Sequence, residues 1–250
     1  PIPRRGVGIQ NLHINRTILE TKGYFALVLH AHLPFVRHPE HARFLEEDWF
    51  FEALTETYLP LLDVFEGLAR DGVPFRVTLS LTPPLLSMMT DPLLQQRFLN
   101  YLDERLEALA GEQRRTSGDA NYHPVVLFYT ELFTRLRKRF VEQDRMDVSQ
   151  SFRRLMEAGH LEIITCGATH GYFPLLAVNE ESLYAQLSMA VRTHERILGR
   201  RPRGIWLPEC AYKPGVDRLL REFGIEYFIL DSHGLLNADP RPKYGVHRPI

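Results

Sequence analysis

The sequence predicts an α/β fold in which parallel strands and helices alternate around a barrel. Short apolar runs of strand length recur along the chain, and each is followed by a stretch with helical periodicity. The runs are almost continuously apolar, which is typical of strands buried on both faces. Polar residues come directly after them, where parallel barrels place their chemistry. With 250 residues and 44% hydrophobic content, the chain is long enough to form one such domain.

The strands are assigned to runs that are too short for helices and rich in β-branched and aromatic residues. The first reads YFALVLH and follows Gly23, and the second reads FRVTLSL and follows Pro74. Five strands are expected, over residues 24–30, 75–81, 161–165, 204–207 and 227–230.

Helices are expected where apolar residues recur every three or four positions. Pro60 lies inside the first such stretch and is expected to kink or divide it. Asp91 and Pro92 form the start of the second, as an N-cap followed by proline in the first turn. The predicted helices cover residues 49–70, 92–109, 127–158, 180–198 and 214–223.

Residues 24–250 are expected to form one domain behind a leader. The leader, residues 1–23, carries Pro, Gly and Arg without periodicity and is expected to be extended or disordered. The polar segment Gly111–Asn121 is expected to be a loop. With the helical pattern that follows, it predicts a mostly helical insertion around residues 111–158, outside the barrel wall. The chain starts without Met and ends without a closing element, which suggests a piece of a longer protein.

Composition narrows the class of partner. The formal net charge is −1 and the pI is about 7.0, so no global field favours nucleic acid or an anionic membrane, and neither is an expected partner. No apolar run approaches the ~20 residues of a membrane span. Cys166 and Cys210 are far apart and outside any CxxC pair, so the sequence contains neither a disulfide framework nor a recognisable four-ligand zinc site. A reducing cytoplasm fits this cysteine usage.

The polar residues at the predicted strand ends are expected to converge, because the carboxyl ends of parallel strands share one face of a barrel. Buried parallel strands need no polar residues there for stability. In chain order these residues are His30 and His32, Thr82, the segment Cys166–His170, Glu209, and Asp231 with His233.

Each of these residues also has a structural interpretation. Glu209 follows Pro208 at a strand exit, and it could cap a helix or pair with an arginine as readily as act in catalysis. Asp231 could cap a turn. Trp49 could be a packing residue, or an indole on which a sugar stacks. His30 and His32, one residue apart at a strand end, favour function.

Two chemistries fit these strand ends. His30 and His32 could ligate a metal with His170, Asp231 and His233, as in some metal-dependent hydrolases. That hypothesis gives Glu209 no special role. In a glycosidase, Glu209 would attack an anomeric carbon while the histidines and the aspartate hold sugar hydroxyls.

Three motifs in order resemble glycoside hydrolase family 57, and within it the α-1,4-glucan branching enzymes. They are His30–Phe35 (HAHLPF), Gly159–Thr165 (GHLEIIT) continuing through Ala168–Gly171 (ATHG), and Trp206–Tyr212 (WLPECAY). The resemblance runs from about Gly23 to the last residue, and Trp49–Ala53 with the Glu56-Thr57-Tyr58 that follows resembles the first helix of the branching enzymes.

The resemblance implies a distorted (β/α)7 barrel, incomplete in this chain, and a retaining mechanism. It makes Glu209 the nucleophile and gives His30, His32, Trp49, His170 and Asp231 to substrate binding, with no metal and no cofactor. The acid/base aspartate lies in a fourth motif that does not occur before Ile250, so residues 1–250 alone are expected to be inactive.

The leading functional hypothesis is a 1,4-α-glucan branching enzyme, whose partner would be an α-glucan such as amylose or glycogen. A 4-α-glucanotransferase or an α-amylase of the same family is the alternative. Two other classes stay open: a metal-dependent hydrolase or deacetylase that uses the His-x-His pair, and a non-catalytic glucan-binding fragment.

Overall fold

The computed structural model describes residues 23–248. The predicted leader lies outside this range apart from Gly23, as do Pro249 and Ile250. In chain order the elements are β1 (Val28–Ala31), α1 (Leu45–Ala53), the π-helix η1 (Leu54–Tyr58), α2 (Leu59–Arg70), β2 (Val77–Leu81), α3 (Pro83–Met89), α4 (Pro92–Thr116), α5 (His123–Lys138), the π-helix η2 (Arg139–Gln143), α6 (Ser149–Glu157), β3 (Leu161–Cys166), α7 (Phe173–Leu176), α8 (Glu180–Leu198), β4 (Gly204–Trp206), the 3-10 helix η3 (Pro208–Cys210), α9 (Val216–Glu222), β5 (Tyr227–Ile229), α10 (Ser232–Leu236) and the 3-10 helix η4 (Gly245–His247).

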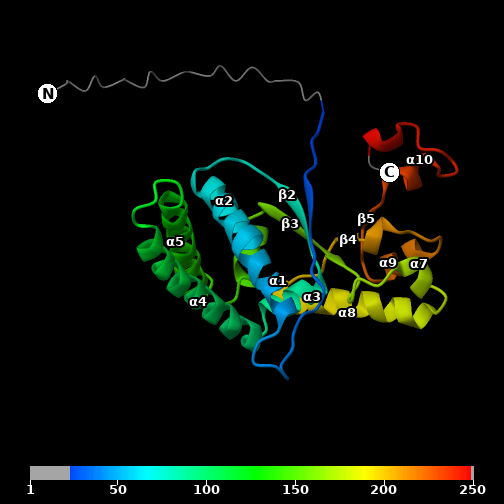
Figure 1. Ribbon diagram of the computed structural model, residues 1–250. Helices are drawn as coiled ribbons and strands as arrows, with labels where there is room; N and C mark the ends of the chain where they lie inside the picture. Colours follow the sequence, from blue (N-terminus) through cyan, green and yellow to red (C-terminus); the bar gives the residue numbers. More distant parts are fainter. Residues whose placement is uncertain (1–22, 249–250) are drawn as a thin grey trace, which may run out of the picture.

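Between residues 23 and 248, five parallel strands form a curled sheet in the order β1-β2-β3-β4-β5 (Figure 1). His30 of β1 lies opposite Ser80 of β2, and Cys166 of β3 lies opposite Trp206 of β4. Because each strand pairs in parallel with the next one in sequence, the carboxyl ends of all the strands lie along one edge. The predicted α/β class, with an incomplete parallel barrel, is confirmed.

The first strand differs from its prediction. It begins at Val28 rather than at residue 24, and Tyr24 and Phe25 are 96% and 90% exposed. Pairing with the second strand starts where Leu27 O accepts the N–H of Thr78. The apolar residues before this point have no strand to pair with among residues 23–248, so apolar character alone does not make them a strand.

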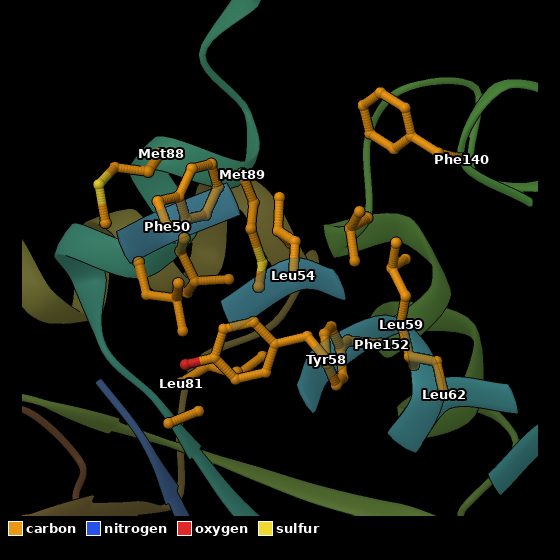
Figure 2. Packing of buried hydrophobic residues seen from close by; sticks show 14 of the residues in the cluster. Phe50, Leu54, Tyr58, Leu59, Leu62, Leu81, Met88, Met89, Phe140 and Phe152 are labelled. Carbon is orange, nitrogen blue, oxygen red and sulfur yellow. The ribbon is translucent and has the colours of Figure 1, made fainter. Parts of the chain in front are cut away.

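The helices against β1–β3 bury the larger of two apolar clusters. Figure 2 shows Phe50, Leu54 and Tyr58, from α1 and η1, packed with Leu81 at the end of β2 and with Met88 of α3. All five are at most 6% exposed. The second cluster surrounds β4 and is formed by Phe173, Leu183, Leu187, Val191, Ile205, Leu207, Val216, Leu219, Leu220 and Ile225.

The expected kink or division of the first long helix at Pro60 takes the form of a π turn within a continuous helical run. This run begins at Leu45 and contains η1 just before Pro60, which lies in the first turn of α2. Proline has no N–H to donate to the carbonyl of Glu56, which explains a wider π turn at this point. Asp91 caps α4 as predicted, because its Oδ1 accepts the N–H groups of Leu93 and Leu94. In the described part of the chain, no helix has both the length and the apolar character needed to cross a membrane.

The loop predicted over Gly111–Asn121 is longer than the loop in the structure. Helix α4 continues to Thr116, because its flank packs on α5, where Gln113 Nε2 donates to Thr130 Oγ1 at 2.8 Å. The helix predicted over residues 127–158 is broken by η2 and by the left-handed residues Arg145 and Met146. The resulting α4–α5 hairpin lies to one side of the sheet (Figure 1), whereas α6, also expected outside the wall, packs on β3 and α8.

A buried arginine ties η2 to α2. The Arg139 side chain is 2% exposed and donates to Asp63 at 2.6 Å and to Glu66 at 2.7 and 3.0 Å. Its Nε lies 3.3 Å from Asp144, whose carboxylate is fully buried. Burial raises the pKa of Asp144 to about 6, although Ser151 and Arg139 act in the opposite direction. Breaking such a buried network leaves charges without partners.

Candidate active site

The candidate site forms where β1, β3 and β4 end on the same edge of the sheet. His30 is the next-to-last residue of β1, and His32 follows that strand directly. His170 lies in the loop after β3, and Glu209 lies in the tight turn after β4. Residues that are up to 179 positions apart in sequence therefore meet because their parallel strands end on the same edge of one curled sheet.

Three imidazoles form a stacked cluster. The rings of His32 and His170 are 3.9 Å apart and inclined by 17°, and Nε2 of His30 lies 3.3 Å from Nε2 of His170. His32 Nδ1 is 3.2 Å from Thr82 Oγ1, which comes from the end of β2. The convergence of the strand-end histidines predicted from the sequence is therefore present, and Thr82 joins it.

The proton positions in this cluster follow from its surroundings. His30 Nδ1 is buried without a hydrogen-bond partner, and His170 Nδ1 lies 3.9 Å from Glu209 Oε1. We assign the proton of His30 to Nε2, which donates to His170, and the proton of His170 to Nδ1, which faces the carboxylate. The opposite assignment would bury an N–H without an acceptor and turn a lone pair toward a negative charge.

The imidazoles are neutral at pH 7. Burial, together with repulsion from the other rings, lowers the pKa of His30 and of His32 to about 4. Burial also lowers the pKa of His170, and the charge of Glu209 partly opposes that shift. Because a neutral imidazole carries one donor and one acceptor, this surface suits hydroxyl groups, which need both.

Glu209 has a strained backbone. Its φ of 56° and ψ of 26° lie in the left-handed region, and Cys210 and His170 share this feature with φ values of 52° and 56°. The turn is closed by Cys210 N–H, which donates to Leu207 O at 2.7 Å. On the N-terminal side of Glu209, the ring of Pro208 restricts the backbone φ angle of the turn. The carboxylate is 74% exposed, so it is presented to solvent at the strand end rather than buried in an ion pair.

Two predicted site residues lie apart from the cluster. Asp231 follows β5, is exposed, and pairs with His233 Nδ1 at 3.2 Å. Its charge acts on Cys210, next to Glu209, and among the described residues it has no contact with the three imidazoles. Trp49 is half exposed on α1, and its ring has no aromatic neighbour in the described cluster.

Trp206 is a site residue that the sequence reasoning did not single out. Its ring lies parallel to that of His30, with centroids 4.5 Å apart and an angle of 11°. It therefore forms one wall of the histidine cluster. The sequence feature that could have identified Trp206 is its position: it is the only aromatic residue of its strand and comes directly before the Leu207-Pro208-Glu209 turn.

The side chains that could ligate a metal do not form a metal site in the described part of the chain. There, no group of three His, Cys, Asp or Glu side chains is arranged to hold a metal ion. Cys166 and Cys210 are both free thiols. Burial raises the pKa of the Cys166 thiol to about 12, so it is not a thiolate at neutral pH.

Comparison with known proteins identifies the family. The model of glycosyl hydrolase family 57 matches residues 26–247. The chain belongs to this family. The resemblance based on three motifs is therefore confirmed, and the family match covers all of β1 to β5 together with both motif histidines, His170 and Glu209.

Individual members of the family are similar over most of this chain. It is 37% identical to a 1,4-alpha-glucan branching enzyme of Thermococcus kodakarensis, over 90% of this chain and 34% of that protein. It matches the structure of an alpha-amylase of Thermotoga maritima with a TM-score of 0.87 and 41% identity, over 91% of this chain and 43% of that one. The GH57-type branching enzyme of Pyrococcus horikoshii gives a TM-score of 0.80 at 35% identity, over 88% and 44%. The chain thus spans about a third to under half of the length of these relatives.

Proposed function

We propose that this chain forms the nucleophile-bearing part of a retaining α-glucan-active enzyme, with 1,4-α-glucan branching as its leading activity. The observation that carries the proposal is the exposed Glu209 carboxylate, held on a left-handed turn 3.9 Å from His170 Nδ1. A helix cap or a structural ion pair would not need backbone strain, whereas strained residues concentrate at functional sites. The substrate would be an α-glucan such as amylose, with a glycogen-like product, and the cytoplasm is the proposed location.

Glu209 would act by nucleophilic substitution. Its Oε attacks the anomeric carbon of a glucosyl unit, the bond from that carbon to the glycosidic oxygen breaks, and a second carboxylic acid protonates the departing oxygen. The second carboxylate then takes a proton from a 6-hydroxyl group of an acceptor glucan, which attacks the same carbon and releases Glu209. Two inversions retain the α configuration.

The second carboxyl group must lie about 5 to 5.5 Å from the nucleophile in a retaining enzyme. Among the described residues, Glu209 is the only carboxylate that acts on the three imidazoles. The aspartate of a fourth motif beyond Ile250 remains the proposed acid and base.

The histidines would bind rather than react. His30, His32 and His170 are neutral at pH 7. In the proposed subsite, His32 Nε2 and His170 Nδ1 would hydrogen-bond sugar hydroxyls, and His30 would line the subsite and hold His170 through its Nε2–H. The proposed contacts of Trp49 and Asp231 lie farther out, where a longer glucan would extend.

Alpha-amylase activity is the second candidate, in which water replaces the 6-hydroxyl group as acceptor. The observation in its favour is the high structural similarity to the Thermotoga maritima alpha-amylase. A metal-dependent hydrolase using the His-x-His pair would instead require metal for activity, and a glucan-binding fragment would bind glucan without turnover.

The test uses the full-length protein with amylose. Glu209→Gln keeps the shape of the side chain and removes its charge, and we expect it to abolish both branching and hydrolysis. In Glu209→Ala, azide should restore turnover of an activated glycosyl donor, because a small anion can attack from the vacated space. Near-normal activity in Glu209→Gln would remove this residue from the mechanism. New α-1,6 linkages distinguish branching from hydrolysis, which gives new reducing ends, and activity that is lost on chelation would favour the metal-dependent class.

A further inference from the structure

One residue of α8 holds the loop that carries His170. The side-chain oxygen of Gln186 accepts the backbone N–H of Thr169 at 2.9 Å, and its amide donates to Thr169 Oγ1 at 2.7 Å. The backbone carbonyl of Gln186 also accepts the N–H of Ala168, at 3.3 Å. Gln186 therefore fixes two consecutive residues directly before His170.

The same residue lies where this loop meets the turn of Glu209. A Cβ added to Gly167 would be 2.8 Å from the Phe173 ring, 3.2 Å from Pro208 and 3.3 Å from Gln186 Oε1. Only glycine allows so close an approach. The loop is thus packed between Gln186 and Pro208, the residue before Glu209.

His170 needs such support, because its left-handed backbone is unfavourable for a residue with a Cβ atom. Its N–H donates to Gly167 O at 3.1 Å, which closes a tight turn. Unfavourable conformations persist only where the surroundings fix them from several sides. The hydrogen bonds from Gln186 to the preceding residues supply that constraint.

We propose that Gln186 is a positioning residue for the candidate site: by clamping Thr169 it holds His170 in the left-handed conformation that directs Nδ1 toward Glu209. This inference deepens the proposed function and rests on it. Gln186 itself contacts no reacting atom. It acts through His170, whose ring also stacks on His32.

The test compares Gln186→Leu with a matched glutamine elsewhere, in the full-length protein. Gln113 Nε2 donates to Thr130 Oγ1 at 2.8 Å in the α4–α5 hairpin, so Gln113→Leu removes the same kind of Gln–Thr contact away from the site. We expect Gln186→Leu to lower kcat about 10- to 100-fold with KM nearly unchanged, because small displacements of positioned groups have effects of this size. Gln113→Leu should leave kcat unchanged.

Two further measurements separate positioning from a general loss of structure. Gln186→Glu keeps an acceptor for the Thr169 N–H and for its hydroxyl group, so it should restore most of kcat. Gln186→Leu should cause little further loss in a His170→Ala background, because both changes act through the same ring. A full additional loss in that background would overturn the proposal.

Amide hydrogen exchange gives a readout that does not depend on activity. A peptide covering residues 167–172 should exchange faster in Gln186→Leu than in the unmodified protein, and at the unmodified rate in Gln113→Leu. Unchanged exchange, or unchanged kcat, in Gln186→Leu overturns the positioning role. If Glu209→Gln stays active, the proposed function has failed, while the exchange result still decides whether Gln186 holds the loop.

Discussion

Replacing Glu209 with glycine should make the protein more stable than replacing it with alanine. The φ of 56° at this position is unfavourable for any residue with a Cβ atom, by about 1–2 kcal/mol. Glycine removes that strain but loses more backbone entropy on folding, by roughly 0.5–1 kcal/mol relative to alanine. The expected balance favours glycine by about 0.5–1 kcal/mol.

Glu195 provides the matched control. It is exposed in the last turn of α8, where the backbone is still helical, and its side chain has no hydrogen bond or ion pair among the described residues. There, glycine should be less stable than alanine by about 1 kcal/mol, because the helix needs no left-handed residue. The sign of the glycine-to-alanine difference should therefore reverse between the two positions.

Calorimetry of the four full-length variants measures both differences under the same conditions. If alanine is the more stable substitution at position 209 as well as at position 195, the turn is not strained and the reasoning is refuted. The glycine variant should be inactive in either case. A more stable but inactive protein would mean that the turn is kept for its chemistry at the expense of stability.

Three further predictions concern stability. The unfolded chain takes up protons at His30 and His32 near pH 6.5, whereas the folded protein does so only near pH 4, so stability should fall as the pH is lowered from about 6.5 to about 4. After a discount for partial exposure this amounts to about 1–2 kcal/mol for each histidine, and a His30→Gln/His32→Gln variant should lose less stability between pH 7 and pH 4.5 in thermal unfolding. Gly204→Ala should cost about 1–3 kcal/mol, because the new methyl group would lie 2.4 Å from the Tyr227 ring, and an unchanged urea midpoint would contradict this. Arg139→Met should cost about 3–5 kcal/mol by leaving the buried Asp144 carboxylate without its cationic partner, and a loss below about 1 kcal/mol in the same titration would show that this carboxylate does not depend on Arg139.

The sequence by itself determined the elements whose ends are set by local chemistry. Helix α8 begins at the Asn179 cap and ends at the left-handed Gly199, which matches the predicted range of residues 180–198. Pro208 marked the point at which the fourth strand stops, and so placed Glu209 at a strand exit. These features depend on a few adjacent residues, whose preferences act before any long-range contact forms.

The tertiary structure decided everything that depends on partners far along the chain. β1 starts at Val28 because pairing with β2 begins there, although the apolar run starts earlier. The stacking of His32 on His170, and the hydrogen bonds from Gln186 to the loop before His170, arise only when the strands of the sheet and helix α8 pack together. No local pattern marks such contacts, because a glutamine in a helix has the same periodicity whether its side chain faces water or clamps a loop. The sequence thus identified the histidines and Glu209 as candidate site residues, and only the packing of the fold set the distances between them.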